Sequence, residues 1–250
     1  MPVVLSVLAH PDDAEFLCAG TLIRLAQKGW KVHIASMTPG DCGSADLDAA
    51  TISAIRRAEG AASAAQIGAS YHCLEERDLR VIYRESALEK VVRLMRQTRA
   101  DLVLTHSPAD YHLDHEMCST LTRAAAFAAA VPNFQEAQGP VTQPLDRVPH
   151  LYYCDPLEGV DALGREIPPA FCIDISAVID QKAHMLAAHA SQRDWLLKHH
   201  GVDHYIDAMR EWSQRRGREV GVAYAEGFRQ HLGHSYPKNN WLVEVLGSGG

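Results

Sequence analysis

Near its N-terminus the chain reads Val3-Val4-Leu5-Ser6-Val7-Leu8-Ala9-His10-Pro11-Asp12-Asp13. Five of the first six residues are apolar and three of them are the β-branched valine, a composition typical of a buried β-strand. No basic segment precedes them and no cleavage signal follows, so we interpret them as a first strand and not as a secretory leader. A helical pattern follows over residues 17–28. Together they predict the opening strand and helix of a parallel sheet.

Strand-like and helix-like segments continue to alternate along the chain. The pattern predicts further strands at residues 30–37, 70–74, 102–105, 150–154 and 170–175, and helices at 49–67, 85–99, about 116–130, 176–200 (capped by Ser176) and about 203–228. This order predicts the α/β class: a Rossmann-like three-layer αβα fold with a mostly parallel sheet in the strand order 3-2-1-4-5. We expect one domain over residues 1–250, with a core at about 1–130 and a substrate loop and C-terminal elements at about 131–246.

The composition excludes several classes of function. The chain has 250 residues, 24 Lys and Arg against 31 Asp and Glu, and a formal charge of -7. It therefore lacks the positive charge that attracts nucleic acids or anionic membranes. No apolar run approaches the roughly 20 residues of a membrane span. The six cysteines form no Cys-x-x-Cys pair, which favours reduced thiols and a cytoplasmic protein.

Polar clusters follow the predicted strands at the point where each strand ends. His10 to Asp13 follow the first strand, Asp41 the second, Asp78 the third, and residues 106–115 the fourth. In open α/β sheets the ligand crevice lies beyond these carboxyl ends, where the strand order reverses. Strands one and four are neighbours in the predicted order. His10 and His115 could therefore contact the same ion.

The first cluster has the chemistry of a divalent metal site. Imidazole nitrogen and carboxylate oxygen are zinc ligands, and a catalytic zinc keeps one position open for water. His10 and Asp13 can supply two ligands, and Asp12 is then free to act on a bound water. The alternative is structural: an aspartate in this turn caps the following helix, as aspartates often do.

The second cluster is His112-Leu113-Asp114-His115. One of its two histidines can complete a His-Asp-His site, with Asp114 hydrogen-bonded to an imidazole. The alternative is a solvated loop before a helix whose dipole favours acidic residues.

Both motifs resemble the bacterial branch of the PIG-L/LmbE-like de-N-acetylases of N-acetylglucosaminyl compounds. The similarity rests on Ala9-His10-Pro11-Asp12-Asp13-Ala14-Glu15, on the later His112-Leu113-Asp114-His115, and on residues 18–22, Arg56, Glu59, Asp78, 171–176, 191–192 and 224–228. It covers nearly the whole chain. Leu113 departs from the proline that usually stands in the second motif, which suggests a less rigid loop.

The resemblance implies a role for each matching residue. His10, Asp13 and His115 would bind the metal, and Asp12 would be the general base. A protonated His112 would stabilise the oxyanion, with Asp114 orienting a histidine. The resemblance also implies Zn²⁺, with Fe²⁺ or another divalent ion suited to the same ligands, and a homo-oligomer.

Four further residues are candidate substrate contacts. The resemblance implies that Arg56 contacts the sugar. The alternative is an ion pair between Arg56 and Glu59 on the exposed face of a helix. Asp78 and Asp41 are predicted at the substrate rim, or else as solvated turn residues. Some relatives carry a tyrosine two residues before the first histidine of the second motif, but that position is Asp110 here. Tyr205 is a candidate substitute for that tyrosine. His106 is predicted as a loop hydrogen-bonding residue.

The predicted activity is removal of the acetyl group from an N-acetylglucosaminyl-type amino sugar, such as a conjugate or a chito-oligosaccharide, by a metal-activated water. General acid–base help from Asp12 is worth roughly 10²–10⁴-fold. One alternative is a metal hydrolase acting on another amide or ester. The other is a catalytically silent sugar-binding homologue.

Overall fold

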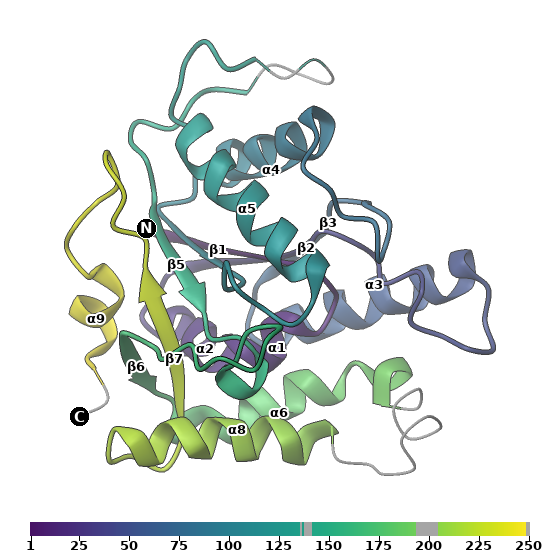
Figure 1. Cartoon of the computed structure of the whole chain (residues 1–250), viewed down its shortest axis with the longest axis vertical. Helices are drawn as coiled ribbons and strands as arrows, with labels where there is room; N and C mark the ends of the chain where they lie inside the picture. The colour runs from purple at the N-terminus through teal and green to yellow at the C-terminus, as the bar shows by residue number, and fades with distance from the viewer. Residues whose placement is uncertain (136, 138–141, 194–204, 249–250) are drawn as a thin grey trace.

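The computed structural model of the chain describes residues 1–135, 137, 142–193 and 205–248. Its strands form one seven-stranded sheet in the order β3-β2-β1-β4-β5-β7-β6 (Figure 1). The strands are β1 (Val3–Leu8), β2 (Lys31–Ser36), β3 (Ser70–Cys73), β4 (Leu102–Thr105), β5 (His150–Cys154), β6 (Phe171–Asp174) and β7 (Ala225–Gln230). The first five are parallel, and the predicted order 3-2-1-4-5 is confirmed.

The helices pack on both faces of the sheet, so the predicted three-layer α/β fold is confirmed. They are α1 (Asp13–Leu17), α2 (Ala19–Gln27), α3 (Ala49–Ala65), α4 (Glu85–Thr98), α5 (Leu113–Ala128), α6 (Ile179–Ala187), α8 (Tyr205–Glu219) and α9 (Trp241–Leu246), with short 3₁₀ turns at Leu157–Gly159 and Ser176–Val178. One apolar core lies between the sheet and α4 and α5, and a second lies between the opposite face and α2, α6, α8 and α9. No helix in the described ranges is long and apolar enough to cross a membrane.

The C-terminal third differs from the prediction. The helix predicted at 203–228 ends at Glu219, and a strand, β7, follows it. Gly217 allows the chain to turn back closely between α8 and β7, because a Cβ at this position would lie 2.7 Å from the backbone of Ala223. β7 pairs antiparallel with both β5 and β6.

The helix predicted at 176–200 is also interrupted. It begins with a 3₁₀ turn, and α6 starts only at Ile179 with Val178 at its N-cap. Ser176 caps nothing there, because its hydroxyl bonds to the backbone of Tyr224. A turn at Ala188 ends α6, and residues 194–200 lie outside the described ranges. Neither α9 nor the short α1 was predicted.

A buried ion pair fixes β7 to the helical layer. Lys182 of α6 donates to Glu226 of β7 at 2.7 Å, and both side chains are almost fully buried. The same carboxylate accepts hydrogen bonds from the backbone N–H groups of Gly20 and Thr21 in the first turn of α2. A single side chain of β7 therefore neutralises Lys182 and satisfies two unpaired donors of a helix N-terminus.

Candidate metal centre and active site

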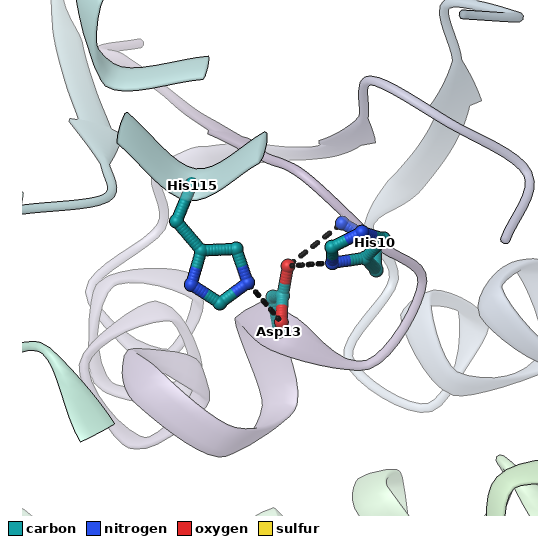
Figure 2. A group of neighbouring side chains, drawn as sticks. All are labelled: His10, Asp13 and His115. Atoms are coloured by element: carbon teal, nitrogen blue, oxygen red, sulfur yellow. Dashed lines mark hydrogen bonds and ion pairs between the residues drawn. The ribbon is translucent and has the colours of Figure 1, made fainter. Parts of the chain in front are cut away.

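The two predicted motifs meet at the carboxyl ends of β1 and β4, which are neighbouring strands. His10 follows β1, Asp13 begins α1, and His115 lies in the first turn of α5, and Figure 2 shows the three side chains facing one another. The Asp13 carboxylate lies 3.3 Å from Nδ1 of His10 and 3.7 Å from Nε2 of His115. One donor atom from each residue falls within 4.8 Å of the others. The structure thus brings together the three residues predicted as metal ligands.

The remaining ring nitrogen of each histidine is held by another carboxylate. Nδ1 of His115 lies 2.9 Å from Asp110, and Nε2 of His10 lies 3.1 Å from Asp78. A carboxylate at one nitrogen fixes the proton there and leaves the lone pair of the other nitrogen free for a cation. The free atoms are Nδ1 of His10 and Nε2 of His115, the two that face Asp13.

The electrostatics of the three residues fit a site for a cation. Burial opposes the charge on His10, but the neighbouring carboxylates outweigh it and raise the pKa of His10 well above its ordinary value. Burial also opposes ionisation of Asp13, yet the imidazoles of His115, His106 and His10 hold its pKa well below its usual range. Negative charge therefore persists at the centre, as a cation site requires. The donor set of two imidazoles and one carboxylate suits Zn²⁺.

Asp12 is placed for chemistry and does not serve as a helix cap. Its backbone is left-handed, with φ of 114°, and its side chain caps no N–H of α1. One carboxylate oxygen instead accepts from Tyr205 at 2.5 Å, and the other accepts from Arg56 at 3.2 Å. Burial raises the pKa of Asp12, and the charge of Arg56 counteracts this in part. The Asp12 side chain therefore does not cap the following helix, which was the structural alternative. Strained backbone of this kind is typical of functional sites.

Arg56 lies behind Asp12 and is buried, with 3% of its surface exposed. It donates to the carbonyl oxygen of Pro11 at 2.9 Å as well as to Asp12. A Cβ on Gly40, whose φ is +68°, would lie 2.1 Å from the guanidinium, so this glycine makes room for it. Glu59, the surface partner considered for Arg56, instead accepts from Ser191. The position of Arg56 supports a role in holding Asp12, and its predicted contact with a sugar stays a prediction.

His112 and Asp114 differ in detail from the prediction. His112 is the N-cap of α5, and its Nδ1 accepts the backbone N–H of Asp114 at 3.1 Å. Burial lowers the pKa of His112, and nearby imidazoles add to this effect. Because Nδ1 accepts this N–H, the ring proton lies on Nε2, and the lowered pKa disfavours the protonated state that we expected. Asp114 lies 3.6 Å from His10 but mainly accepts the backbone N–H groups of residues 79 and 81.

The two predicted rim residues are buried and engaged within the protein. Asp78 holds the His10 ring and accepts the backbone N–H of Cys42. Asp41 accepts from the side chain of Arg77 at 2.7 Å and from the backbone of Asp78. Neither lines the cavity described below. The structure therefore places them as supports for the His10 side of the centre, and their contact with substrate remains a prediction.

Three residues of the site were missed or underestimated by sequence reasoning. Asp110 orients His115, a role that was expected of Asp114. Tyr111 stands edge-on to the rings of His112 and His115 at centroid distances of 5.8 and 5.4 Å. His106 stacks on His115 at 3.8 Å and accepts the backbone N–H of Ala9. The sequence feature that could have identified them is their position, because all three lie within nine residues of His115.

A cavity of about 850 Å³ opens directly from the candidate centre. Its lining includes Asp12, Asp13, His115 and Tyr205, and the rest comes from α1, α8, the 157–158 turn and Tyr111. A substrate in this cavity would reach the Asp12 carboxylate and the candidate ligands at once. Of the predicted substrate residues, Tyr205 is the one that lines it.

Comparison with known families agrees with this geometry. The family model described as PIG-L, GlcNAc-PI de-N-acetylase, matches residues 5–126. This region runs from β1 into α5 and contains both motifs. Over these residues the chain is similar to the PIG-L family. The later helices and the strands β5, β6 and β7 lie outside the matched PIG-L region.

Relatives of known name extend the PIG-L similarity over most of the chain. A 1D-myo-inositol 2-acetamido-2-deoxy-alpha-D-glucopyranoside deacetylase of Rhodococcus erythropolis is 27% identical over 242 residues, covering 76% of this chain and 80% of the relative. Among solved structures, the N,N'-diacetylchitobiose deacetylase of Pyrococcus horikoshii is 24% identical, with a TM-score of 0.77 over 96% of this chain and 88% of that one.

The same fold also carries other chemistry. The 4-carboxy-2-hydroxymuconate hydratase GalB of Pseudomonas putida KT2440 is 23% identical, with a TM-score of 0.75 over 96% of this chain and all of that one. At this level of identity the structural matches show the fold. The activity must therefore be argued from the side chains of the site.

Proposed function

We propose that the protein is a metal-dependent deacetylase of an N-acetylglucosaminyl-type amino sugar. The observation that carries this proposal is the convergence of His10, Asp13 and His115 beside Asp12 at the mouth of a cavity. The named activities of the Rhodococcus and Pyrococcus relatives support the same reaction class. The complete set of candidate ligands and base argues against a silent sugar-binding homologue.

The candidate ligands are His10 through Nδ1, Asp13 through its carboxylate, and His115 through Nε2. When bound there, Zn²⁺ or Fe²⁺ would lower the pKa of a water molecule and polarise the amide carbonyl. Asp78 and Asp110 keep the two imidazoles in the tautomers that leave these atoms free.

Asp12 is the proposed general base. Tyr205 and Arg56 hold its two oxygens, and burial raises its pKa toward the range in which a carboxylate exchanges protons readily. Asp12 removes a proton from the attacking water and returns it to the leaving nitrogen, which departs as a free amine. The products are acetate and an amino sugar.

His112 is the proposed oxyanion donor. Because its Nδ1 accepts a backbone N–H, its Nε2 carries the proton and can donate to the oxygen of the tetrahedral intermediate. His112 thus keeps the role that the resemblance implies, but it acts as an uncharged donor and not as a cation.

Asp12→Asn and His115→Ala separate the two halves of this proposal. We expect Asp12→Asn to keep stoichiometric metal and lose at least 100-fold in kcat, because it retains the ligands and lacks the base. His115→Ala should lose both metal and activity. Bound metal is measured by atomic spectroscopy and acetate release by a coupled assay, with the exposed Asp146→Asn as control. Normal turnover by Asp12→Asn would rule out this role, and failure of the wild type to deacetylate any amino sugar would rule out the function.

We also propose that the enzyme acts in the cytoplasm as a homo-oligomer. The six cysteines, all free, support the compartment. Sedimentation velocity on the metal-loaded protein tests the assembly, and a single species of 27.5 kDa would contradict it.

A further inference from the structure

The cavity beside the candidate centre has a largely apolar wall. Its apolar lining residues are Phe16, Leu17, Tyr111, Leu157, Ala208 and Trp212. They come from α1, the loop before α5, the 157–159 turn and α8, so four separate segments converge on one apolar surface. A free amino sugar presents mostly hydroxyl groups, which such a wall leaves without hydrogen-bond partners.

The size of the cavity also exceeds the need of a single sugar. Its volume of about 850 Å³ lies near the top of the range of roughly 300–1,000 Å³ for sites that hold drug-sized ligands. Asp12, Asp13, His115 and Tyr205 make up only part of the lining. The remainder is therefore available for a second, apolar part of the substrate.

Trp212 is held in place within this wall before any ligand binds. The guanidinium carbon of Arg216 lies 4.6 Å from the centre of the indole ring, and that of Arg215 lies 5.2 Å from it. Arg216 is itself buried and anchored to Asp155 at 2.5 Å. A ring fixed in this way loses little side-chain freedom when a ligand contacts it, which favours binding.

Apart from Asp12 and Asp13 of the candidate centre, the charged residues of the lining balance one another. They are Glu158, Glu211, Arg215 and Arg218, which are exposed and form the rim, two of each sign. The rim therefore offers no net attraction to an anionic or cationic ligand. An uncharged group fits this arrangement best.

From the apolar wall, the volume and the balanced rim, we propose that the cavity binds an uncharged aromatic or alkyl group joined to the amino sugar. The inference rests on the proposed deacetylation, because it assumes that the sugar's acetamido group sits at Asp12. The apolar group is either an aglycone on the anomeric oxygen or a longer acyl chain on the nitrogen. Both offer the same chemistry to Trp212.

Four compounds test the proposal on the metal-loaded enzyme: N-acetylglucosamine, its 4-nitrophenyl and octyl β-glycosides, and N-octanoylglucosamine. New primary amine is the measured product. We expect at least one apolar compound to exceed N-acetylglucosamine by 10-fold or more in kcat/KM, which is about 1.4 kcal/mol. Preference for the glycosides assigns the group to the aglycone, and preference for the N-octanoyl compound assigns it to the acyl chain.

Ala208→Trp fills the cavity from an exposed position of α8, so the variant should fold. We expect it to reduce the preference for the apolar compound to less than 3-fold. Asp207→Trp, one residue earlier on the same helix and outside the cavity lining, is the matched control and should retain the preference. Equal kcat/KM values for all four compounds in the wild type would overturn the proposal, as would an unchanged preference in Ala208→Trp.

Calorimetric titration separates this inference from the proposed function. The ligands are glucosamine and 4-nitrophenyl and octyl glucosaminides, which need no turnover to be measured. Tighter binding of an apolar glucosaminide by 10-fold, lost in Ala208→Trp, supports the cavity assignment even if no compound is deacetylated. Equal binding of all three, together with no preference for N-octanoylglucosamine over N-acetylglucosamine in turnover, overturns it while leaving deacetylation of a small amino sugar intact.

Discussion

At the scale of single residues, the candidate centre depends on the carboxylates that hold its imidazoles. Asp110 and Asp78 each take one ring nitrogen of a candidate ligand, and both are buried. This arrangement orients the rings before a cation arrives. It also explains why Asp110 matters although it faces no substrate.

We expect Asp110→Ala to weaken metal affinity by 10–100-fold, because the His115 ring loses the partner that fixes its tautomer. Asp110→Asn should lose less, since the amide oxygen still accepts the Nδ1 proton. Chelator competition gives the affinities, with Asp146→Ala as a surface control. Wild-type affinity in Asp110→Ala would show that His115 is oriented by other contacts.

The sequence allowed some of these residues to be predicted and not others. His10, Asp13 and His115 were predictable because each lies in the loop or the first helical turn that follows an apolar strand, where side chains converge. Asp110 was not assigned, because its role depends on the loop between β4 and α5 folding back toward α5. The tautomer of His112 depends on a helix-cap hydrogen bond that appears only when the exact start of α5 is known.

At the scale of elements, β7 joins the sheet to the helices through Glu226. This strand was predicted as helix because residues 225–228 follow a helical segment directly and show no alternation of apolar and polar side chains. A strand buried on both faces has no such alternation. The parallel strands were easier to predict, since β-branched runs and helices alternate there at regular intervals.

We predict that Lys182→Met destabilises the protein by about 3–5 kcal/mol, because it leaves the Glu226 carboxylate buried without its cation. The double variant Lys182→Met/Glu226→Gln removes that charge and should recover part of the loss. Urea unfolding measures both. The exposed pair of Arg57 and Glu75 is the control, and Arg57→Ala should cost at most about 1 kcal/mol. A loss of only about 1 kcal/mol in Lys182→Met would show that the buried pair contributes no more to stability than an exposed one.

At the scale of the whole molecule, acid sensitivity follows from histidines that the fold keeps neutral. Nδ1 of His33 in β2 lies 2.9 Å from Nε2 of His72 in β3. Burial, together with the charges of His72 and Lys31, lowers the pKa of His33 from 6.5 to about 4. The unfolded chain therefore binds a proton here between these pH values and the folded chain does not. Stability consequently falls as the pH drops from 6.5 toward 4.

His33→Asn should remove this contribution, which we expect to be about 2 kcal/mol at pH 4 relative to pH 7 after allowance for solvent. Thermal unfolding of wild type and variant across pH 4–7.5 measures it. The decline in Tm on acidification should be shallower in the variant. His234→Asn, at a surface histidine, is the control. Parallel Tm curves for wild type and His33→Asn would refute the assignment.

The place of β7 between β5 and β6 has a consequence for biosynthesis. In the described sheet β6 pairs only with β7 (Figure 1). As the nascent chain leaves the ribosome, β6 emerges well before its sole partner, and β5 meanwhile presents an open edge. Chaperones that shield unpaired strands should therefore engage this chain late in translation, until the segment around Phe228 closes the sheet.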